Sequence, residues 1–270
     1  MTDCVYPAAL ARRYDRDYAA MGRTKDVDFY VELARQAARA GSGATAASVL
    51  EVACGTGRVL LPMARALAES GAPRATVTGV DPSAEMRAQL VAKLAREPEA
   101  VRARVTVLAG RFDLIPARGP FALVCSPFRA FQHLQTADEQ QAAVTSMASV
   151  LAPGGLLAFD VFDYNPDFAA RRGNAPDCAY DEGGQHIERH SVVRLDEVTR
   201  CVRLDLRWYA DGEPTGEQAG CSMKISTRDE LAALVARAGL ELVGVYGDFD
   251  RSPHDPARPR ELVVVATKPE

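Results

Sequence analysis

The chain of 270 residues lacks long apolar runs, an excess of basic charge and clusters of metal-binding side chains. No stretch approaches the ~18 consecutive apolar residues that a membrane-spanning helix needs. The net charge is −4 with no basic block, which argues against nucleic acid as a partner. The 4 histidines are scattered and the 6 cysteines show no Cys-x-x-Cys spacing. We therefore expect neither a metal site nor a disulfide framework.

The first residues also lack the basic and apolar regions of a signal peptide. With no membrane segment either, we expect a cytoplasmic protein with no membrane or nucleic-acid partner, present as a monomer or a homodimer. At this length the chain can bury a full hydrophobic core, as one large domain or as a domain with an insertion.

Residues 48–58 are the most informative stretch of the chain. An apolar, β-branched run ends in a turn that contains Gly55 and Gly57, and residues 58–70 then show helical periodicity. In such a strand–turn–helix unit the backbone passes close to a ligand, and free amides at the helix N-terminus hold a carboxylate or phosphate. Leu60 stands where a dinucleotide-binding fingerprint needs its third glycine, so a dehydrogenase is disfavoured.

Two carboxylates accompany this turn. Glu51 precedes it, where it would repel a pyrophosphate and would suit a ligand with a cationic part, such as an ammonium or sulfonium group. Asp81 ends a second predicted strand, the setting of an acid that accepts hydrogen bonds from both hydroxyls of a ribose. The alternative role for Asp81 is a cap for the helix that follows.

Two motifs carry a resemblance to a known family: Glu51-x-x-Cys54-Gly55-Thr56-Gly57 and, further on, Gly79-Val80-Asp81-Pro82-Ser83. In this order and at this distance they resemble the first two motifs of class I S-adenosylmethionine-dependent methyltransferases. The whole pattern is similar to small-molecule enzymes of that family, including bacterial amino-sugar and other natural-product N-methyltransferases. The resemblance implies a Rossmann-like, doubly wound seven-stranded sheet, S-adenosylmethionine as cofactor and S-adenosylhomocysteine as product.

Alternation of strands and helices predicts an α/β domain in which helices cover both faces of a parallel sheet. Residues 153–155, Pro-Gly-Gly, are predicted to separate the last helix of this part from its fifth strand, and residues 165–184 to form a loop. The expected strands are 48–53, 75–80, 104–108, 121–125 and 155–162, and the expected helices are 58–70, 83–96 and 136–151.

After the predicted loop the pattern changes to strict alternation. Residues 186–195 and 201–209 predict a hairpin, which a strand at 217–225 extends into a small antiparallel sheet. A capping box at Thr227 opens a helix to residue 238, and strands at 241–246 and 262–267 end the chain. We thus predict an N-terminal helical lid (1–47), a methyltransferase domain (48–164 and 226–270) and an inserted antiparallel β substrate cap (165–225).

The resemblance places the cofactor beyond the C-terminal ends of the strands. The sequence departs from the family after the third strand, where Arg111 replaces the acid that binds the adenine amino group. Asp113 is the candidate substitute, and Phe112 is expected to cover the adenine face. The expected cofactor-binding residues are Glu51, Ala53, Cys54, Gly55, Gly57, Arg58, Asp81, Pro82, Ser83, Met86, Arg111, Phe112, Asp113 and Ser126.

His133 and Tyr14 are the candidate catalytic residues. The unperturbed pKa of histidine suits a general base, and the alternative for His133 is a helix-start histidine bonded to nearby backbone. Tyr14 lies in a tyrosine-rich segment that either closes over the ligand or packs as an ordinary helix face. The candidate substrate-binding residues are Tyr18, Tyr30, Phe128, Arg129, Asp163, Tyr164, Arg207 and Tyr209; on the inserted strands half of the side chains must face away from any pocket.

The function that we predict is methyl transfer from S-adenosylmethionine to a nitrogen or oxygen of a small metabolite, without a metal. One alternative is a macromolecule methyltransferase, although Ser126-Pro127-Phe128 stands where enzymes that methylate base amines carry an Asn/Asp-Pro-Pro-aromatic motif. The other alternative is a non-catalytic protein that binds S-adenosylmethionine or S-adenosylhomocysteine, which the replacement at Arg111 leaves open.

Overall fold

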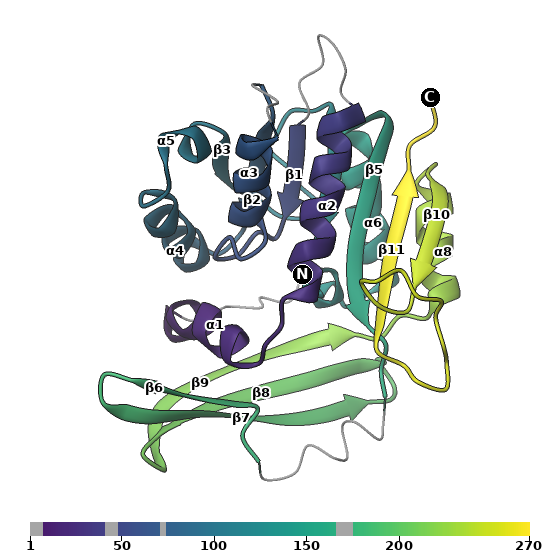
Figure 1. Ribbon diagram of the computed structural model, residues 1–270. Helices are drawn as coiled ribbons and strands as arrows, with labels where there is room; N and C mark the ends of the chain where they lie inside the picture. The colour runs from purple at the N-terminus through teal and green to yellow at the C-terminus, as the bar shows by residue number, and fades with distance from the viewer. Residues whose placement is uncertain (1–7, 41–47, 71–73, 166–174) are drawn as a thin grey trace.

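A seven-stranded mixed sheet forms the centre of the protein (Figure 1). The computed structural model describes residues 8–40, 48–70, 74–165 and 175–270. The strand order is β10-β11-β5-β4-β1-β2-β3, and β11 runs antiparallel to both of its neighbours. The predicted class I methyltransferase fold is therefore confirmed. The strands are β1 (Ser48–Val52), β2 (Thr76–Asp81), β3 (Val105–Ala109), β4 (Phe121–Ser126), β5 (Leu151–Phe162), β10 (Glu241–Tyr246) and β11 (Glu261–Thr267).

Helices cover both faces of this sheet, so its central strands are buried on both sides. In β1 the neighbouring residues Val49 and Leu50 point to opposite faces, and both are fully buried. Figure 1 shows α2 (Lys25–Ala40) and α3 (Leu60–Glu69) in front of the sheet, and α6 (Ala137–Ser149) and α8 (Arg228–Arg237) behind it. The remaining helices of this part are α4 (Ala84–Leu94), α5 (Glu99–Arg102) and the 3-10 helix η1 (Ala130–His133).

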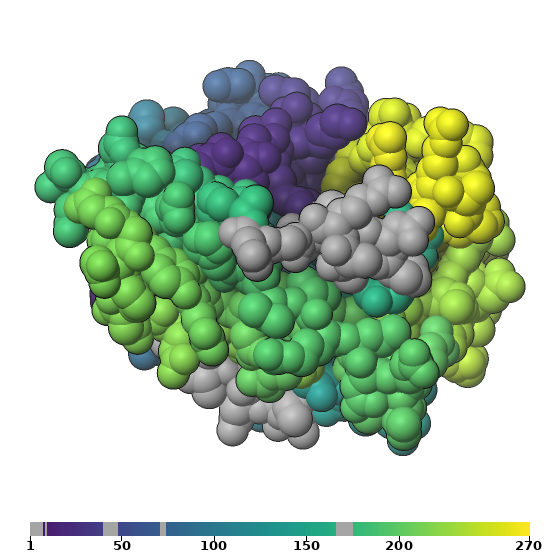
Figure 2. Space-filling view, turned by 90° about the horizontal axis from the view of Figure 1, so that it is seen from below, coloured from purple at the N-terminus to yellow at the C-terminus, as the bar shows by residue number. Residues whose placement is uncertain are grey.

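A second, four-stranded antiparallel sheet lies across the C-terminal ends of the parallel strands (Figure 1). Its green strands spread over the face seen from below in Figure 2. The predicted hairpin is confirmed, but the predicted loop over 165–184 was wrong in part, because residues 178–182 pair with the next strand; residues 166–174 lie outside the described ranges. The strands are β6 (Cys178–Glu182), β7 (Gln185–Asp196), β8 (Cys201–Ala210) and β9 (Glu213–Lys224).

The boundary predicted at Pro153-Gly154-Gly155 was also wrong. Strand β5 already begins at Leu151, which pairs with Phe121, and the pairing resumes at Leu156 with Leu123. The extra residues form an irregularity within the strand, which a sequence pattern cannot distinguish from a stop. The capping residues were predicted better: Thr227 forms the expected capping box of α8, and the Ser83 side chain caps α4.

Helix α1 (Ala8–Ala20) lies between the two sheets and is held by both (Figure 1). Toward the inserted sheet, the fully buried Asp17 accepts hydrogen bonds from Trp208 Nε1 (3.0 Å) and Tyr180 Oη (2.9 Å) and pairs with the Arg189 guanidinium (3.4 Å). Toward the main sheet, Thr56 Oγ1 donates to Asp15 Oδ1 at 2.6 Å. Helix α1 therefore bridges the inserted sheet and the turn after β1.

In the described ranges no helix is long and apolar enough to cross a membrane. The same ranges contain no group of three or more histidine, cysteine, aspartate or glutamate side chains placed to hold a metal ion.

Candidate active site

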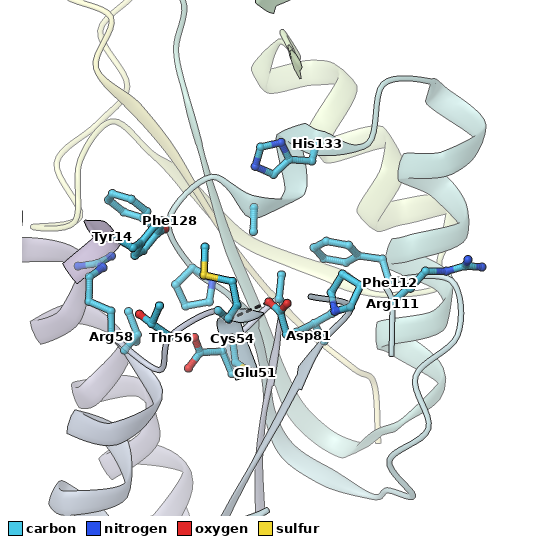
Figure 3. A pocket seen from close by; sticks show the side chains of 18 of the residues that line it. Tyr14, Glu51, Cys54, Thr56, Arg58, Asp81, Arg111, Phe112, Phe128 and His133 are labelled. Carbon is cyan, nitrogen blue, oxygen red and sulfur yellow. Dashed lines mark hydrogen bonds between the residues drawn. The ribbon is translucent and has the colours of Figure 1, made fainter. Parts of the chain in front are cut away.

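Two cavities lie beyond the C-terminal edge of the main sheet, on either side of a shared wall. The first, of about 280 Å³, is formed by the ends of β1, β2 and β4 with the turns that follow them (Figure 3). The second, of about 360 Å³, lies between α1, the inserted sheet and the segments next to β5 and β11. Tyr14, Phe128 and His133 line both cavities, so the two spaces meet at these three side chains.

Gly55 and Gly57 have different roles in the turn after β1. Gly57 has a φ of 78°, and a Cβ there would lie 2.3 Å from Leu90 Cδ1, so this glycine allows α4 to pack against the turn. Gly55 has a φ of 52°, and a Cβ there would meet nothing within 4 Å. Gly55 lines the first cavity, whereas Gly57, a predicted cofactor residue, supports the turn from behind.

Asp81 is held in place by backbone amides. Its Oδ2 accepts from Gly55 N and its Oδ1 from Ser83 N, both at 2.8 Å. Burial raises the pKa of this carboxyl, while the two amide bonds oppose the rise. The side chain of Asp81 thus faces the cavity in a fixed orientation, with acceptor capacity left for ligand hydroxyls. Ser83 caps α4 and lies outside the cavity lining.

Glu51 lies at the bottom of the cavity in Figure 3 and is 2% exposed. No described residue hydrogen-bonds its Oε2, and burial raises the pKa of the carboxyl well above its usual value. A buried acceptor without a partner is costly, and a cationic ligand group would satisfy it. This observation fits the sulfonium and ammonium groups of S-adenosylmethionine.

Arg58 links the cofactor turn to the shared wall. Its guanidinium binds Asp26 and lies over the Phe128 ring, 4.1 Å from the centroid. Burial lowers the pKa of Arg58, but the bond to Asp26 outweighs this effect and the pKa is raised. The guanidinium is therefore a fixed positive group at the edge of the cavity.

The region after β3 corrects one prediction. Phe112 lines the cavity as expected and packs edge-on against Phe131, with 6.2 Å between the ring centroids. Asp113 does not line the cavity, because its carboxylate binds the Arg111 guanidinium through two hydrogen bonds of 3.0 and 3.1 Å. Figure 3 shows Arg111 pointing away from the other labelled side chains. Asp113 is thus not the substitute for the adenine acid in this conformation.

Ser126 ends β4 and is fully buried, but it lines neither cavity. The expectation that Ser126 binds the cofactor is therefore not supported by its position. The other predicted cofactor residues that line the first cavity are Ala53, Cys54, Pro82, Met86 and Arg111.

The second cavity is lined by five of the eight predicted substrate residues: Tyr18, Phe128, Arg129, Asp163 and Tyr164. Arg129 binds Glu261 through Nε (3.2 Å) and Nη2, so its charge is already compensated. Asp163 Oδ2 lies 2.8 Å from His254 Nε2. These polar groups of the wall have protein partners.

The other three predicted substrate residues lie elsewhere, which is a correction. Arg207 and Tyr209 are on the outer face of β8, because Leu206 and Leu204, on the alternate positions, line the cavity. Tyr30 is fully buried on α2, and its hydroxyl donates to Asp160 Oδ1 at 2.7 Å.

Asp160 is a structural residue of the site that the sequence reasoning missed. Its carboxylate accepts from Phe128 N (2.8 Å) and Arg129 N (2.9 Å), two consecutive residues with φ of 60° and 64°. Asp160 thereby compensates a strained turn and holds Phe128 in the wall between the cavities. Burial raises the pKa of Asp160 to about 7. The available signal was an acid within the otherwise apolar run of β5.

Residues 49–155 match a family model described as a methyltransferase domain. No curated protein matches the sequence of the chain. Among solved structures, CalS10, an amino pentose methyltransferase from Micromonospora echinaspora, is 26% identical with a TM-score of 0.66, covering 94% of this chain and 96% of its own.

Two further structures share the fold. The sugar N-methyltransferase KedS8 from Streptoalloteichus is 23% identical, with a TM-score of 0.69 and coverage of 100% and 98%. The CcbJ methyltransferase from Streptomyces caelestis is 24% identical, with a TM-score of 0.66 and coverage of 88% and 90%.

The fold, the acidic cofactor cavity and the matched domain define this protein as an S-adenosylmethionine-dependent methyltransferase. In its fold it resembles the amino pentose methyltransferase CalS10 and the sugar N-methyltransferase KedS8.

Proposed function

We propose that the protein methylates a nitrogen or oxygen of a small molecule that binds in the second cavity. The observation that carries this proposal is the shared wall: Tyr14, Phe128 and His133 line both the cofactor cavity and the cavity under the inserted sheet. A nucleophile at this junction would lie next to the cofactor site while the rest of the acceptor fills the second cavity. Alignment of this kind supplies much of the rate of a group transfer.

The cofactor, when bound, supplies an electrophilic methyl group. The chain's own residues have separate roles in this proposal. Glu51 compensates the positive charge of the ligand, Asp81 binds the ribose hydroxyls and Phe112 packs against the adenine. Helix α1 closes the junction and the inserted sheet encloses the acceptor, so residues 1–47 act as a lid and 165–225 as a substrate cap.

His133 is the candidate proton acceptor at the junction, and Tyr14 positions the nucleophile beside it. A hydroxyl acceptor needs a base, whereas an amine that arrives neutral needs none for the transfer itself. CalS10 is an amino pentose methyltransferase and KedS8 is a sugar N-methyltransferase, and these relatives favour nitrogen. Full activity of His133→Ala would support an amine acceptor.

The first experiment is a calorimetric titration with S-adenosylhomocysteine. We expect Asp81→Ala to weaken binding at least tenfold, about 1.4 kcal/mol, because the ribose and the Gly55 amide both lose their acceptor. Asp113→Ala is the matched control, since this acid also follows a strand end but binds Arg111, and it should bind like the wild type. Absence of binding to the wild type would overturn the proposal.

The acceptor is then sought with S-adenosylmethionine carrying a labelled methyl group, incubated with candidate amines and alcohols. Label recovered in a small molecule supports the proposal. Label recovered only in protein or nucleic acid would assign a macromolecule methyltransferase instead, and binding of S-adenosylhomocysteine without any transfer would indicate a non-catalytic binder.

A further inference from the structure

Most of the wall that the inserted sheet contributes to the second cavity is apolar. On β7, β8 and β9 the apolar side chains that line the cavity are Val193, Val202, Leu204, Leu206, Cys221 and Met223, and Arg189 on β7 is the charged residue of this wall. The register makes the apolar residues continuous, because Val193 pairs with Leu204, Leu204 with Cys221, and Val202 with Met223. Directly paired residues of antiparallel strands share one face. The sheet therefore presents a continuous apolar patch to whatever occupies the cavity.

The charged side chains that line the cavity are largely paired within the protein. Arg129 is bound to Glu261, and Asp163 lies beside His254. Arg189, on β7 of the inserted sheet, is 3% exposed and pairs with Asp17 on α1 and with Asp177, both at 3.4 Å, while its Nε has no hydrogen-bond partner in the described ranges. A polyhydroxylated ligand would have to compete with these pairs or leave most of its own hydroxyls without partners, which costs free energy in either case.

Two phenol hydroxyls lie at or next to the junction. The hydroxyls of Tyr14 and Tyr18 make no hydrogen bond to another residue in the described ranges, and both rings pack edge-on against Phe128. Burial keeps the pKa of Tyr14 well above its usual value, so its hydroxyl stays protonated. The cavity thus combines a polar site next to the cofactor cavity with an apolar wall across from it.

We propose that the acceptor is amphiphilic: it places one uncharged amine or hydroxyl at Tyr14 and Tyr18 and lays an apolar body on the inserted sheet. The inference rests on the proposed function, since it assigns the second cavity to the acceptor. Removal of the apolar body from water then provides most of the acceptor's binding, and the polar end provides its orientation.

The test uses 4-alkylanilines, whose amine is uncharged at neutral pH, titrated into protein saturated with S-adenosylhomocysteine. We expect the affinity to rise from 4-ethylaniline through 4-butylaniline to 4-hexylaniline, by up to about fourfold per methylene, as for burial of a CH₂ group. The probe 4-aminophenyl glucoside carries the same amine on a hydroxylated body and should bind at least tenfold more weakly than 4-hexylaniline. Equal affinities along the series, or tighter binding of the glucoside, would overturn the inference.

Neighbouring valines on β7 provide a matched pair of variants. Val193 lines the cavity, whereas Val192 is on the outer face and 43% exposed. Val193→Asn should lower the affinity for 4-hexylaniline at least tenfold, whereas the affinity of Val192→Asn should stay within twofold of the wild type. Leu204→Ala, which removes apolar surface without adding a polar group, should also weaken it.

Unchanged binding of 4-hexylaniline in both Val193→Asn and Leu204→Ala would refute the apolar wall as the acceptor site. The S-adenosylhomocysteine titration distinguishes failure of the proposed function from failure of the amphiphilic acceptor. If the wild type does not bind S-adenosylhomocysteine, the methyltransferase proposal itself is refuted. If it binds S-adenosylhomocysteine but all the anilines with equal affinity, only the amphiphilic acceptor is refuted.

Discussion

In the cofactor cavity, the two acidic groups come from the ends of neighbouring strands, and Glu51 Oε2 has no hydrogen-bond partner in the described chain. In the second cavity, the charged groups come from distant segments and are paired with one another. Arg129 is bound to Glu261, and Arg189 lies between two carboxylates, although its Nε has no partner in the described residues. An unsatisfied buried acid indicates a cationic ligand, whereas paired charges around a largely apolar wall indicate a mainly apolar one.

The two cavities also differ in what holds them together. Asp81 and the glycine turn are positioned by the main sheet, which is covered on both faces. The second cavity depends on α1 and on the polar contacts of Asp17 beneath it. Substitutions should therefore affect one cavity and leave the other unchanged.

Asp17→Ala should damage the second cavity and spare the first. It leaves Arg189 with only Asp177 as an anionic partner and removes the acceptor of Trp208 Nε1 and the Tyr180 hydroxyl. Breaking a buried ion pair costs about 3–5 kcal/mol, and we expect a loss of about 3 kcal/mol in unfolding free energy because Asp177 remains. Denaturant unfolding followed by fluorescence of Trp208, the single tryptophan, measures it.

The control for Asp17 is Asp15→Ala, two residues along the same helix. The side chain of Asp15 is 39% exposed; it pairs with Lys93 and accepts a hydrogen bond from Thr56, so its removal should cost about 1–2 kcal/mol, less than the removal of Asp17. Equal losses in the two variants would contradict the central role of the buried cluster.

Asp160→Asn should damage the wall that the cavities share. The asparagine side chain places its NH₂ group next to the backbone N–H of Phe128 or Arg129, so one buried donor loses its acceptor. An unsatisfied buried donor costs about 1–3 kcal/mol. The pKa of Asp160 is about 7 in the folded chain, against an ordinary 3.8, so the folded chain binds this proton more tightly than the unfolded chain. The stability that the carboxyl contributes is therefore full below about pH 4 and is lost as the pH rises to about 7.

The substitution should accordingly cost more stability at pH 5 than at pH 8, as measured by denaturant unfolding at both values. Tyr30→Phe, which removes one bond to the same carboxylate and leaves both amide bonds, should cost less at either pH. A cost for Asp160→Asn that does not vary with pH would show that the carboxyl does not titrate in this range.

Glu51→Gln should affect the cofactor cavity alone. We expect affinity for S-adenosylmethionine to fall about tenfold, or 1.4 kcal/mol, because the cationic ligand loses its counter-charge. The pKa of Glu51 is raised by burial, so its ionisation opposes folding at high pH, and the ligand-free variant should be at least as stable as the wild type at pH 8. Calorimetry and thermal unfolding measure the two effects.

Adenosine is the control ligand for this variant, because it keeps the ribose but has no cationic group. Its affinity should be the same in Glu51→Gln and in the wild type. An equal loss for adenosine and S-adenosylmethionine would mean that the substitution deforms the cavity instead of removing a charge.

Arg111→Ala should have the smallest effect on the cofactor cavity. Arg111 lines the cavity, but its guanidinium is bound to Asp113 in an exposed pair, and such pairs contribute about 0–1 kcal/mol. We expect S-adenosylhomocysteine affinity within twofold of the wild type by calorimetry. Phe112→Ala, one residue further on and also in the cavity lining, should weaken binding about fivefold, since an aromatic contact contributes about 1 kcal/mol. The reverse order would assign the adenine contact to Arg111.

The comparison also explains which predictions from the sequence succeeded. The cofactor cavity was predictable because a short strand–turn–helix unit positions its own residues: the bond between Gly55 and Asp81 joins two strand ends that are neighbours in the sheet. The role predicted for Asp113 was wrong because Asp113 binds Arg111, two residues away. The sequence does not show whether the side chains of this pair point into the cavity or away from it.

In the inserted sheet, the alternation of β8 specified that Leu204 and Leu206 share one face and Arg207 and Tyr209 the other. Which face is inward depends on the side on which α1 packs, because both faces of these strands contain aromatic and charged residues. The assignment of Arg207 and Tyr209 to the substrate failed at this step.

By itself, the sequence determined the class of fold, the cofactor and the residues around the turn after β1, because glycine conformations, strand periodicity and helix capping act over a few residues. Only the tertiary structure decided that Asp160 holds Phe128 between two cavities, that Arg129 is paired with Glu261, and that the aliphatic face of the inserted sheet turns inward. These contacts join residues more than 30 positions apart. Their partners are selected by packing and burial of the whole chain, which a local pattern does not encode.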